Sequence, residues 1–279
     1  MTALQIPNVT LNDGHEIPQL GVGVYLVPEE DCERVVGDAL ELGYRHIDTA
    51  RIYDNEVETG RAIAASGVPR DELFITTKLW NSDQDRAEEA FQENLDRLGL
   101  DRVDLYLVHW PLPMFEGSAL GAWKSLIEIA KSGRATSIGV CNFEIPDLQR
   151  LLDETGVLPA VNQIELHPLH QRRELVEFCA EHGIAIEAWG PLAQGKSDLL
   201  ERPEVVAAAE AHGKTPAQVV LRWHVQQGRI VFPKTLRRER LIENAALFDF
   251  ELSDAETAAI DSLDEQRNFG PDPRTFDVR

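Results

Sequence analysis

The stretch from Arg45 to Glu56, RHIDTARIYDNE, decides how the rest of this chain is interpreted. Its residues His46 to Thr49 form a short run that predicts a buried strand. A turn then leads to Tyr53, and a helical pattern opens at Asn55. An acid at a strand end and a phenol a few residues later would lie on one rim of a sheet. We therefore expect Asp48 and Tyr53 to share a site at that rim.

The same alternation of a short apolar run and a helical segment recurs along the chain. Between the runs, segments such as Ala87 to Leu98 carry apolar residues at helical spacing. Crossovers long enough for a helix imply parallel pairing, and eight parallel strands can close into a barrel. The sequence therefore predicts an α/β fold of the (β/α)8 TIM barrel type. Its strands are expected at Gln19 to Val24, His46 to Thr49, Phe74 to Lys78, Val103 to His109, Ser137 to Cys141, Ala160 to Gln163, Ala185 to Trp189 and Ile230 to Phe232.

A doubly wound sheet is the alternative architecture. It would need a dinucleotide-binding fingerprint at the first strand, where Gly21-Val22-Gly23 is followed by Val24-Tyr25-Leu26. The third glycine of that fingerprint is missing, and no acidic residue ends the next strand in the expected setting. The barrel is therefore the preferred fold.

Three segments lie outside the repeating units. Val9 to Ile17 surrounds an Asp-Gly pair, which predicts an N-terminal β-hairpin that acts as a lid or plug. The alanine-rich stretch Glu204 to His212 predicts an extra helix near the C-terminus, and the tail from Asp264 to Arg279 is expected to pack across the barrel mouth. No flexible linker divides the chain, so residues 1–279 are expected to form one domain.

Composition narrows the class of function. The 279 residues carry a formal charge of -21, and a field of that sign repels nucleic acid and anionic membrane. Cys32, Cys141 and Cys179 show neither disulfide nor zinc spacing, so no metal site is expected. The N-terminus lacks a signal-peptide pattern and no apolar run is long enough to span a membrane, which favours a cytoplasmic protein.

Polar or aromatic side chains stand at most of the predicted strand ends, where the active site of an α/β barrel lies. Taken singly, Asp48, Tyr53, Lys78 and His109 each have a structural explanation. Together they suit proton transfer, because an ammonium beside a phenol stabilises the phenolate and lowers the phenol pKa from about 10. A carboxylate can hold that ammonium, and His109 can orient a substrate oxygen. The set indicates protonation of an oxygen that gains negative charge, as in carbonyl reduction.

Carbonyl reduction also needs a hydride, which implies a nicotinamide cofactor. Trp189 offers a flat face for the ring, and Asn142 and Gln163 offer donors and acceptors for its carboxamide. The run Lys234 to Arg240, KTLRRER, places four cations after the last predicted strand of an acidic chain. A solvated helix face is the ordinary explanation, but barrels often bind phosphate here and arginine suits phosphate. A 2′-phosphate would explain the cluster and favours NADPH over NADH.

These residues resemble those of the aldo-keto reductases, and within that family those of the bacterial 2,5-diketo-D-gluconate reductases. The similarity runs from about Val9 to the end of the chain. Four stretches carry it: GYRHIDTA at 43–50 with Tyr53, DLYLVHWP at 104–111, VNQIELHP at 161–168, and FPKTLRRER at 232–240 with Asn244. Three positions depart from the commonest pattern. Cys141 and Thr235 stand where serine is usual, and Trp189 matches the diketogluconate-reductase branch, where many relatives have tyrosine.

The resemblance implies a role for each site residue. Tyr53 would be the proton donor, tuned by Lys78 and Asp48, and Glu165, His167 and Pro168 would fix the loop after the sixth strand. The substrate, an aldehyde, ketone or dicarbonyl such as 2,5-diketo-D-gluconate, would meet His109, Trp80 and Trp110. The NADPH contacts would be Asn142, Gln163, Trp189, Gly190, Leu192, Lys234, Thr235, Arg237, Arg240 and Asn244. By the same resemblance the protein would be a monomer.

Two other classes of function remain as alternatives. A barrel that binds NADPH and reports redox state to a partner would hold the cofactor without oxidising it on any carbonyl compound. A barrel hydrolase would need paired carboxylates or a metal cluster at the strand ends, where only Asp48 fits. NADPH-dependent carbonyl reduction is the preferred interpretation.

Overall fold

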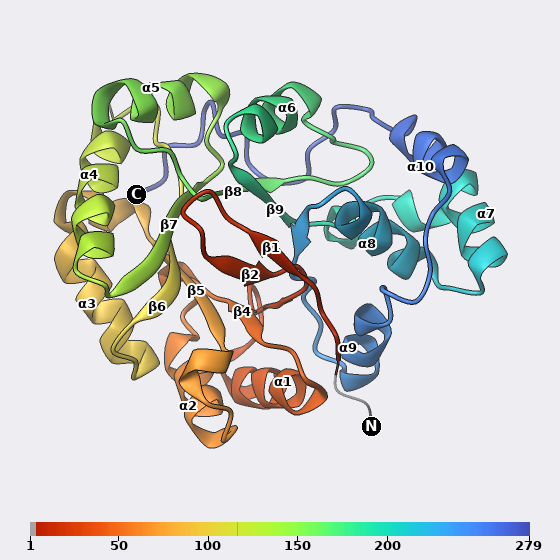
Figure 1. Ribbon diagram of the computed structural model, residues 1–279, viewed down its shortest axis with the longest axis horizontal. Coiled ribbons are helices and arrows are strands. Elements are labelled where there is room, and N and C mark those ends of the chain that lie inside the picture. The colour runs from red at the N-terminus through yellow and green to blue at the C-terminus, as the bar shows by residue number, and fades with distance from the viewer. Residues whose placement is uncertain (1–3, 116) are drawn as a thin grey trace.

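The computed structural model describes residues 4–115 and 117–279, and Figure 1 shows strands enclosed by helices. One parallel sheet of eight strands runs in the order β10-β9-β8-β7-β6-β5-β4-β3, so each strand pairs with its neighbours in the sequence. The strands are β3 (Val22–Gly23), β4 (His46–Asp48), β5 (Phe74–Leu79), β6 (Val103–Val108), β7 (Ala135–Cys141), β8 (Val161–Glu165), β9 (Ala185–Trp189) and β10 (Ile230–Val231).

The sheet closes on itself between its first and last strands. Leu20 forms a parallel bridge with Val231, and the Gly21 amide donates to the Val231 carbonyl at 2.8 Å. The Val231 amide in turn donates to the Gln19 carbonyl at 3.0 Å. A doubly wound sheet would instead reverse its strand order at the centre. The predicted barrel is therefore confirmed, and the alternative architecture is excluded.

Helices cover the outside of the barrel, one after each strand. The helix after β10, α9, packs against both α8 and α1, so the helical ring closes as the strand ring does. Its members are α1 (Glu29–Leu42), α2 (Glu56–Ala65), α3 (Ala87–Leu98), α4 (Ser118–Lys131), α5 (Ile145–Thr155), α6 (Arg173–Glu181), α8 (Pro216–Gln226) and α9 (Arg238–Ala245). Two more helices lie outside the ring, α7 (Pro203–His212) and α10 (Asp254–Asp261), as expected near the C-terminus.

Short 3-10 turns and local capping signals shape the connections. The turns are η1 (Arg51–Tyr53), η2 (Arg70–Glu72), η3 (Asn81–Arg86), η4 (Ala193–Gly195) and η5 (Leu199–Glu201). Thr215 and Ser253 each begin a helix with a capping box, in which the hydroxyl accepts from a backbone N–H three residues later. α1 ends at Gly43, whose φ of 103° is a conformation that glycine adopts readily.

The barrel interior changes character from one end to the other. Side chains alternate along a strand, so Phe74, Thr76 and Lys78 of β5 share the inward face. At the amino end, Phe74 packs in an apolar cluster with Val161 and Ile230. Towards the carboxyl ends the buried inward residues are polar or charged. The charged end of the interior is therefore the end at which a barrel carries its active site.

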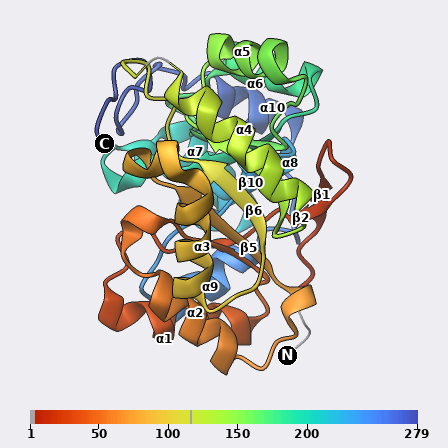
Figure 2. The ribbon, with the colours of Figure 1, turned by 90° about the vertical axis from the view of Figure 1, so that its left-hand side faces the viewer.

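The N-terminal hairpin closes the apolar end. β1 (Asn8–Thr10) pairs antiparallel with β2 (Glu16–Pro18), and Ile17 is fully buried in the cluster that holds Phe74 and Ile230. Both of these residues open their strands, so the hairpin lies at the amino ends. Figure 2 shows the hairpin and the C-terminal end on opposite sides of the barrel. The hairpin is therefore a plug beneath the barrel and leaves the strand carboxyl ends free.

Candidate active site

Tyr53, Lys78 and Asp48 meet at the carboxyl ends of β4 and β5. Lys78 Nζ donates to Asp48 Oδ1 at 2.8 Å, to Asp48 Oδ2 at 2.9 Å and to the Thr49 carbonyl at 2.9 Å. The same nitrogen lies 3.2 Å from Tyr53 Oη. Tyr53 ends the turn η1 directly after β4, and this turn places the phenol beside the strand end. The structure thus brings together the three groups that the sequence suggested for proton transfer.

Lys78 and Asp48 form a buried ion pair. Their side chains are 0% and 2% exposed, so water contributes little to either charge. Burial opposes the charged form of Lys78, but the Asp48 carboxylate raises the pKa of Lys78 above its ordinary value. Burial raises the pKa of Asp48, and the Lys78 ammonium opposes that rise. A buried pair of this kind holds its geometry, because either charge left alone would be costly.

The pKa of Tyr53 departs from the sequence-based expectation. Burial raises the pKa of Tyr53 above its ordinary value, and the charge of Lys78 offsets only part of this rise. Lys78 lowers the pKa of Tyr53 as expected, but burial outweighs this effect, so the net shift in the protein alone is upward. A phenol in this position stays protonated at neutral pH, as a proton donor must. The ammonium at 3.2 Å is placed to stabilise the phenolate once the proton has left.

His109 and Trp80 lie beside the phenol. His109 is the residue directly after β6. The centroid of its ring lies 6.0 Å from the Tyr53 ring centroid and 5.2 Å from the Trp80 ring centroid. Burial and the charge of Lys78 hold the pKa of His109 well below its ordinary value, so the imidazole is neutral. Its Nδ1 is buried and has no hydrogen-bond partner in the described part of the chain. A neutral imidazole keeps one donor and one acceptor, which fits the orientation of a carbonyl oxygen.

The residues expected at the nicotinamide are already hydrogen-bonded to groups at the barrel mouth. Trp189 Nε1 donates to Asn142 Oδ1 at 2.8 Å, and Asn142 Nδ2 donates to the His109 carbonyl at 3.1 Å. Gln163 Nε2 donates to Asp48 Oδ2 at 2.9 Å. After these bonds the Asn142 amide retains one hydrogen and one lone pair, and the Gln163 oxygen has no partner within the described residues. The remaining groups suffice to bind a carboxamide.

Gly190 and Leu192 follow Trp189 directly in the loop after β9. Gly190 has a φ of 61°, a left-handed conformation that favours glycine. Leu192 is half-buried and packs against the apolar core. Their expected contacts with a cofactor stay predictions.

The basic run after β10 divides into paired and unpaired cations. Arg238 pairs with Asp38 at 2.6 Å and with Glu41 at 3.0 Å, and so it fastens α9 to α1. Lys234, Arg237 and Arg240 are exposed and form no salt bridge within residues 4–115 and 117–279. Unpaired cations are notable in a chain of charge -21, and they fit a phosphate group.

Two neighbours of the unpaired cations were also expected at the cofactor. The Thr235 hydroxyl accepts from the Arg237 backbone N–H at 3.1 Å and so orders the start of α9. Asn244 lies on α9 and is 6% exposed. The hydroxyl of Thr235 keeps its hydrogen for a further acceptor, because it accepts in this contact.

Glu165 at the end of β8 anchors the C-terminal tail. Its Oε1 accepts from the Phe269 N–H at 2.7 Å, and its Oε2 accepts from the Gly270 N–H at 3.0 Å. A β-carbon on Gly270 would collide with the Trp189 ring, so any other residue would have to displace that ring or the tail. His167, which pairs with His170 through the backbone, holds the loop after β8. Glu165 was expected to fix this loop, and the structure gives it the additional task of fastening the tail.

The last residues of the tail continue across the barrel mouth, as expected. The Phe276 ring packs on Trp110 with centroids 4.2 Å apart. Asn81 Nδ2 donates to the Val278 carbonyl at 2.7 Å. Trp110 is 7% exposed, so it supports the tail more than it faces the cleft.

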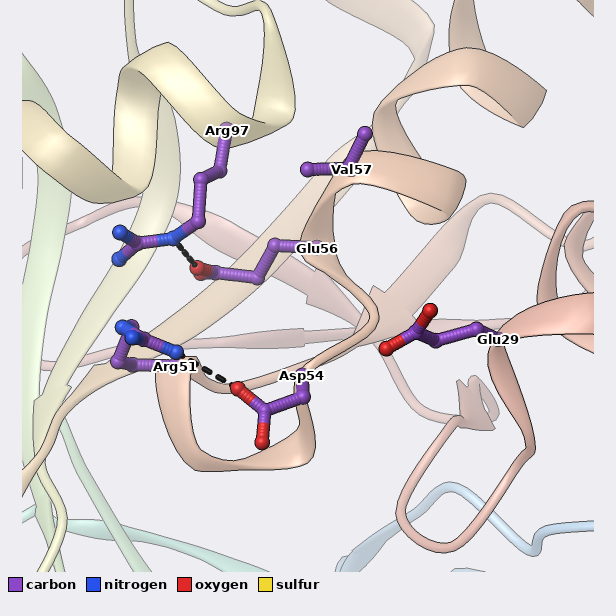
Figure 3. A pocket seen from close by; sticks show the side chains of 6 residues that line it. All are labelled: Glu29, Arg51, Asp54, Glu56, Val57 and Arg97. Carbon is purple, nitrogen blue, oxygen red and sulfur yellow. Dashed lines mark hydrogen bonds and ion pairs between the residues drawn. The ribbon is translucent and has the colours of Figure 1, made fainter.

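A separate depression lies outside the barrel mouth between α1, η1, α2 and α3 (Figure 3). Figure 3 shows two ion pairs there, Arg97 with Glu56 and Arg51 with Asp54, at 2.7 Å and 2.8 Å. Its arginines are thus already neutralised, so it offers no free cation to a ligand. Over the described residues, no group of three acidic, histidine or cysteine side chains is placed to hold a metal ion. No helix in that part of the chain is long and apolar enough to cross a membrane.

The sequence interpretation missed two buried polar residues in the barrel interior, Glu187 and His46. Both are fully buried, and Gln163 Nε2 donates to Glu187 Oε2 at 2.8 Å. A lone glutamate within the apolar strand Ala-Ile-Glu-Ala-Trp was the available signal. Its inward direction follows from the register of β8 and β9, which pairs Gln163 with Glu187.

The closed parallel barrel, with a phenol, an ammonium and a carboxylate joined at its mouth, has the architecture of a (β/α)8-barrel enzyme with its polar cluster at the strand ends. The profile described as "Aldo/keto reductase family" matches residues 19–265 of the chain. This chain belongs to that family.

The sequence similarity to known proteins extends over nearly the whole chain. An aldo-keto reductase of Mycolicibacterium smegmatis is 54% identical over 97% of this chain and 98% of its own length. A protein of Salmonella typhimurium named methylglyoxal reductase DkgA is 50% identical over 96% of this chain and 97% of its own. Among solved structures, a variant of Gox0644 in complex with NADPH has a TM-score of 0.92 at 44% identity, covering 98% of this chain and 99% of that one.

Proposed function

We propose that this protein reduces aldehydes, ketones and dicarbonyls to alcohols with NADPH, and that Tyr53 donates the proton. The observation that carries the proposal is the position of Lys78 Nζ, 2.8 Å from Asp48 and 3.2 Å from Tyr53 Oη. Family membership supports the reaction class.

Each residue of the cluster has one task in the proposed reaction. NADPH, when bound, supplies the hydride that the carbonyl carbon accepts. The oxygen then takes the proton from Tyr53, and the Lys78 ammonium stabilises the phenolate that remains. Asp48 keeps Lys78 charged and in place. His109, neutral and beside the phenol, orients the substrate oxygen.

The residues around the site fit the cofactor. Asn142 and Gln163 retain free amide groups for a carboxamide, and Trp189 offers an aromatic face. Lys234, Arg237 and Arg240 offer three cations that no carboxylate neutralises in the described chain. The complex of Gox0644 with NADPH supports this choice of cofactor by relationship.

The substrate class follows from the relatives and the cleft. The Salmonella relative carries the name methylglyoxal reductase, which makes small dicarbonyls the first compounds to test. Trp80 beside His109 gives the cleft an apolar wall, which places few polar demands on a substrate. A compound such as 2,5-diketo-D-gluconate belongs to the same dicarbonyl class.

The proton donor is tested with Tyr53→Phe. The variant should bind NADPH as tightly as the wild type, measured by fluorescence, and lose about 10²-fold or more of the reductase kcat, the usual contribution of a general acid. Tyr25→Phe is the control, because Tyr25 packs on Tyr53 with ring centroids 5.0 Å apart. A Tyr53→Phe enzyme with the wild-type rate would refute the assignment. NADPH that binds but is not oxidised on any carbonyl would favour the binding-module alternative.

Recognition of the 2′-phosphate is tested with Arg237→Ala and Arg240→Ala. Each should raise the Kd for NADPH about tenfold while the Kd for NADH changes little, because only NADPH carries the phosphate. Arg238→Ala removes a cation of the same run that is already paired with Asp38 and Glu41. It should leave the ratio of the two affinities unchanged. Equal losses for NADPH and NADH in all three variants would contradict the assignment.

A further inference from the structure

Glu187 is a second buried acid close to the catalytic ion pair. It is fully buried in β9, opposite Gln163 of β8. Gln163 Nε2 donates to Glu187 Oε2 at 2.8 Å and to Asp48 Oδ2 at 2.9 Å. One amide group therefore joins both carboxyl groups and is held with its nitrogen between them.

Within the described residues Glu187 forms no salt bridge with a lysine or arginine, and the Lys78 charge offsets only part of its raised pKa. An ammonium has three hydrogens, and Lys78 directs its own to Asp48, to the Thr49 carbonyl and to Tyr53. Glu187 Oε1 has no hydrogen-bond partner in the part of the chain that the structure describes. Its nearest basic neighbour is His46, with Nε2 at 3.7 Å.

The tautomer of His46 shows that this ring supplies no positive charge to Glu187. His46 Nδ1 lies 3.3 Å from the Pro18 carbonyl, which can only accept, so Nδ1 holds the hydrogen. Burial lowers the pKa of His46 to about 3, so the ring is neutral, and the lone pair of Nε2 accepts from the Thr76 hydroxyl at 3.3 Å. At 3.7 Å the Glu187 oxygen is too far from Nε2 for a hydrogen bond, but an ionised Glu187 would set a negative charge near that lone pair, and a neutral Glu187 avoids this repulsion. Burial and the charge of Asp48 raise the pKa of Glu187 to about 8, in agreement with this geometry.

We propose that Glu187 is a positioning residue of the reductase site, which in its neutral form fixes the Gln163 amide and leaves Asp48 as the only anion facing Lys78. The proposal rests on the proposed reduction. With its nitrogen held by the two carboxyl groups, Gln163 presents its oxygen as the free group. When Glu187 loses its proton, a second negative charge enters the cluster and stabilises the protonated form of Tyr53. The phenol then becomes a weaker acid, and proton donation slows.

The other groups around Glu187 complete its environment. The titratable side chains that face it are Asp48 and His46 of β4, Lys78 of β5 and Cys141 of β7. The neighbouring strands contribute Gln163 from β8, and Ile230 and Val231 from β10, none of which titrates. His46 is neutral, and burial raises the pKa of the Cys141 thiol well above its ordinary value. Glu187 is thus the group of this cluster that changes charge just above neutral pH.

Glu187→Gln is the informative variant. Glutamine has the shape of the neutral acid, with an oxygen to accept from Gln163 and an uncharged N–H on the side that faces His46. We expect its kcat at pH 7 to stay within about threefold of the wild type, because the acceptor for Gln163 and the neutral charge are both retained. The wild-type kcat should fall as pH rises past about 8, and the variant should keep its rate there. An alkaline limb at the same pH in both enzymes would overturn the proposal.

Two further variants distinguish a positioning role of Glu187 from a role in folding alone. Glu187→Leu removes the acceptor for Gln163, so its kcat should fall at every pH, and activity should return with glutamine at the same position. Glu181→Gln, at an exposed position on α6, should keep both the rate and the wild-type pH profile. Equal kcat values for Glu187→Leu and the wild type would refute the role.

A spectroscopic measurement needs no folded variant. Infrared spectra of the wild type should show the C=O band of a neutral carboxylic acid at pH 7, and this band should disappear by pH 9.5, about one to two units above the expected titration. Absence of the band at pH 7 would contradict a neutral Glu187. Failure of the proposed function can be distinguished from failure of the Glu187 role, because the wild type would then reduce no carbonyl compound at all.

Discussion

Replacing Lys78 with methionine tests the buried ion pair at the centre of the site. The substitution removes the donor to both Asp48 oxygens and to the Thr49 carbonyl, and leaves Asp48 with the hydrogen bond from Gln163 at 2.9 Å. Asp48 is 1% exposed, so water cannot replace the lost partner. Breaking a buried pair by removing one partner costs about 3–5 kcal/mol of unfolding free energy. For a chain of this size that corresponds to a fall in Tm of roughly 6–20 °C.

The pH dependence of that cost has a definite sign. Without Lys78, burial raises the folded-state pKa of Asp48 further above its unfolded value. The folded state then binds a proton that the unfolded state releases, so stability falls as pH rises through the interval between the two values. The Lys78→Met variant should therefore lie nearest to the wild type in mild acid and farthest from it at neutral pH and above.

A double variant separates stability from chemistry. Lys78→Met with Asp48→Asn removes both charges, so most of the lost unfolding free energy should return, while reductase activity should stay absent. Urea denaturation at several pH values, together with an NADPH oxidation assay, measures both quantities. If the single and the double variant unfold at the same urea concentration at every pH, the cost does not arise from a stranded carboxylate and the reasoning is wrong.

Three other predictions concern different parts of the molecule. Gly60→Ala in α2 should lower the unfolding free energy by about 1–3 kcal/mol, because the new β-carbon would collide with backbone of α3. Gly37→Ala in α1 should raise it by about 0.5–1 kcal/mol, because a β-carbon there meets no other atom. Glu165→Gln should loosen the tail, seen as faster proteolysis of the last residues and an altered KM for the carbonyl substrate with NADPH affinity retained. The raised pKa of Glu187 means that its contribution to stability is lost as pH rises from 4.5 to about 8, so in urea titrations the stability of Glu187→Gln should increase relative to the wild type over this interval and stay level above it.

Local patterns in the sequence were enough to predict the barrel. The Asp-Gly pair within Asn12 to Gly14 predicted the hairpin. The alternation of apolar runs with helical segments predicted the positions of all eight strands of the sheet. The acid and the phenol of the opening stretch lie near each other in the sequence, so their joint position at a strand end could also be expected. The reach of Lys78 to both groups followed from the parallel order of β4 and β5.

The missed features depend on distance and burial in three dimensions. The net rise in the Tyr53 pKa is set by burial, which no residue of the motif reveals. Glu165 binds the backbone of Phe269, 104 residues later, and nothing in either segment announces the contact. The bond between Gln163 and Glu187 depends on the register of two strands, which a strand pattern leaves open.

The bridge between Leu20 and Val231 closes the barrel by joining its first and last strands, which are far apart in the sequence, and this has a consequence for biosynthesis. Until Val231 has been synthesised, the incomplete sheet has two edge strands. Their unpaired amide and carbonyl groups can pair with strands of another nascent chain. A stop codon shortly before Ile230 should therefore yield an insoluble aggregate instead of a smaller soluble protein.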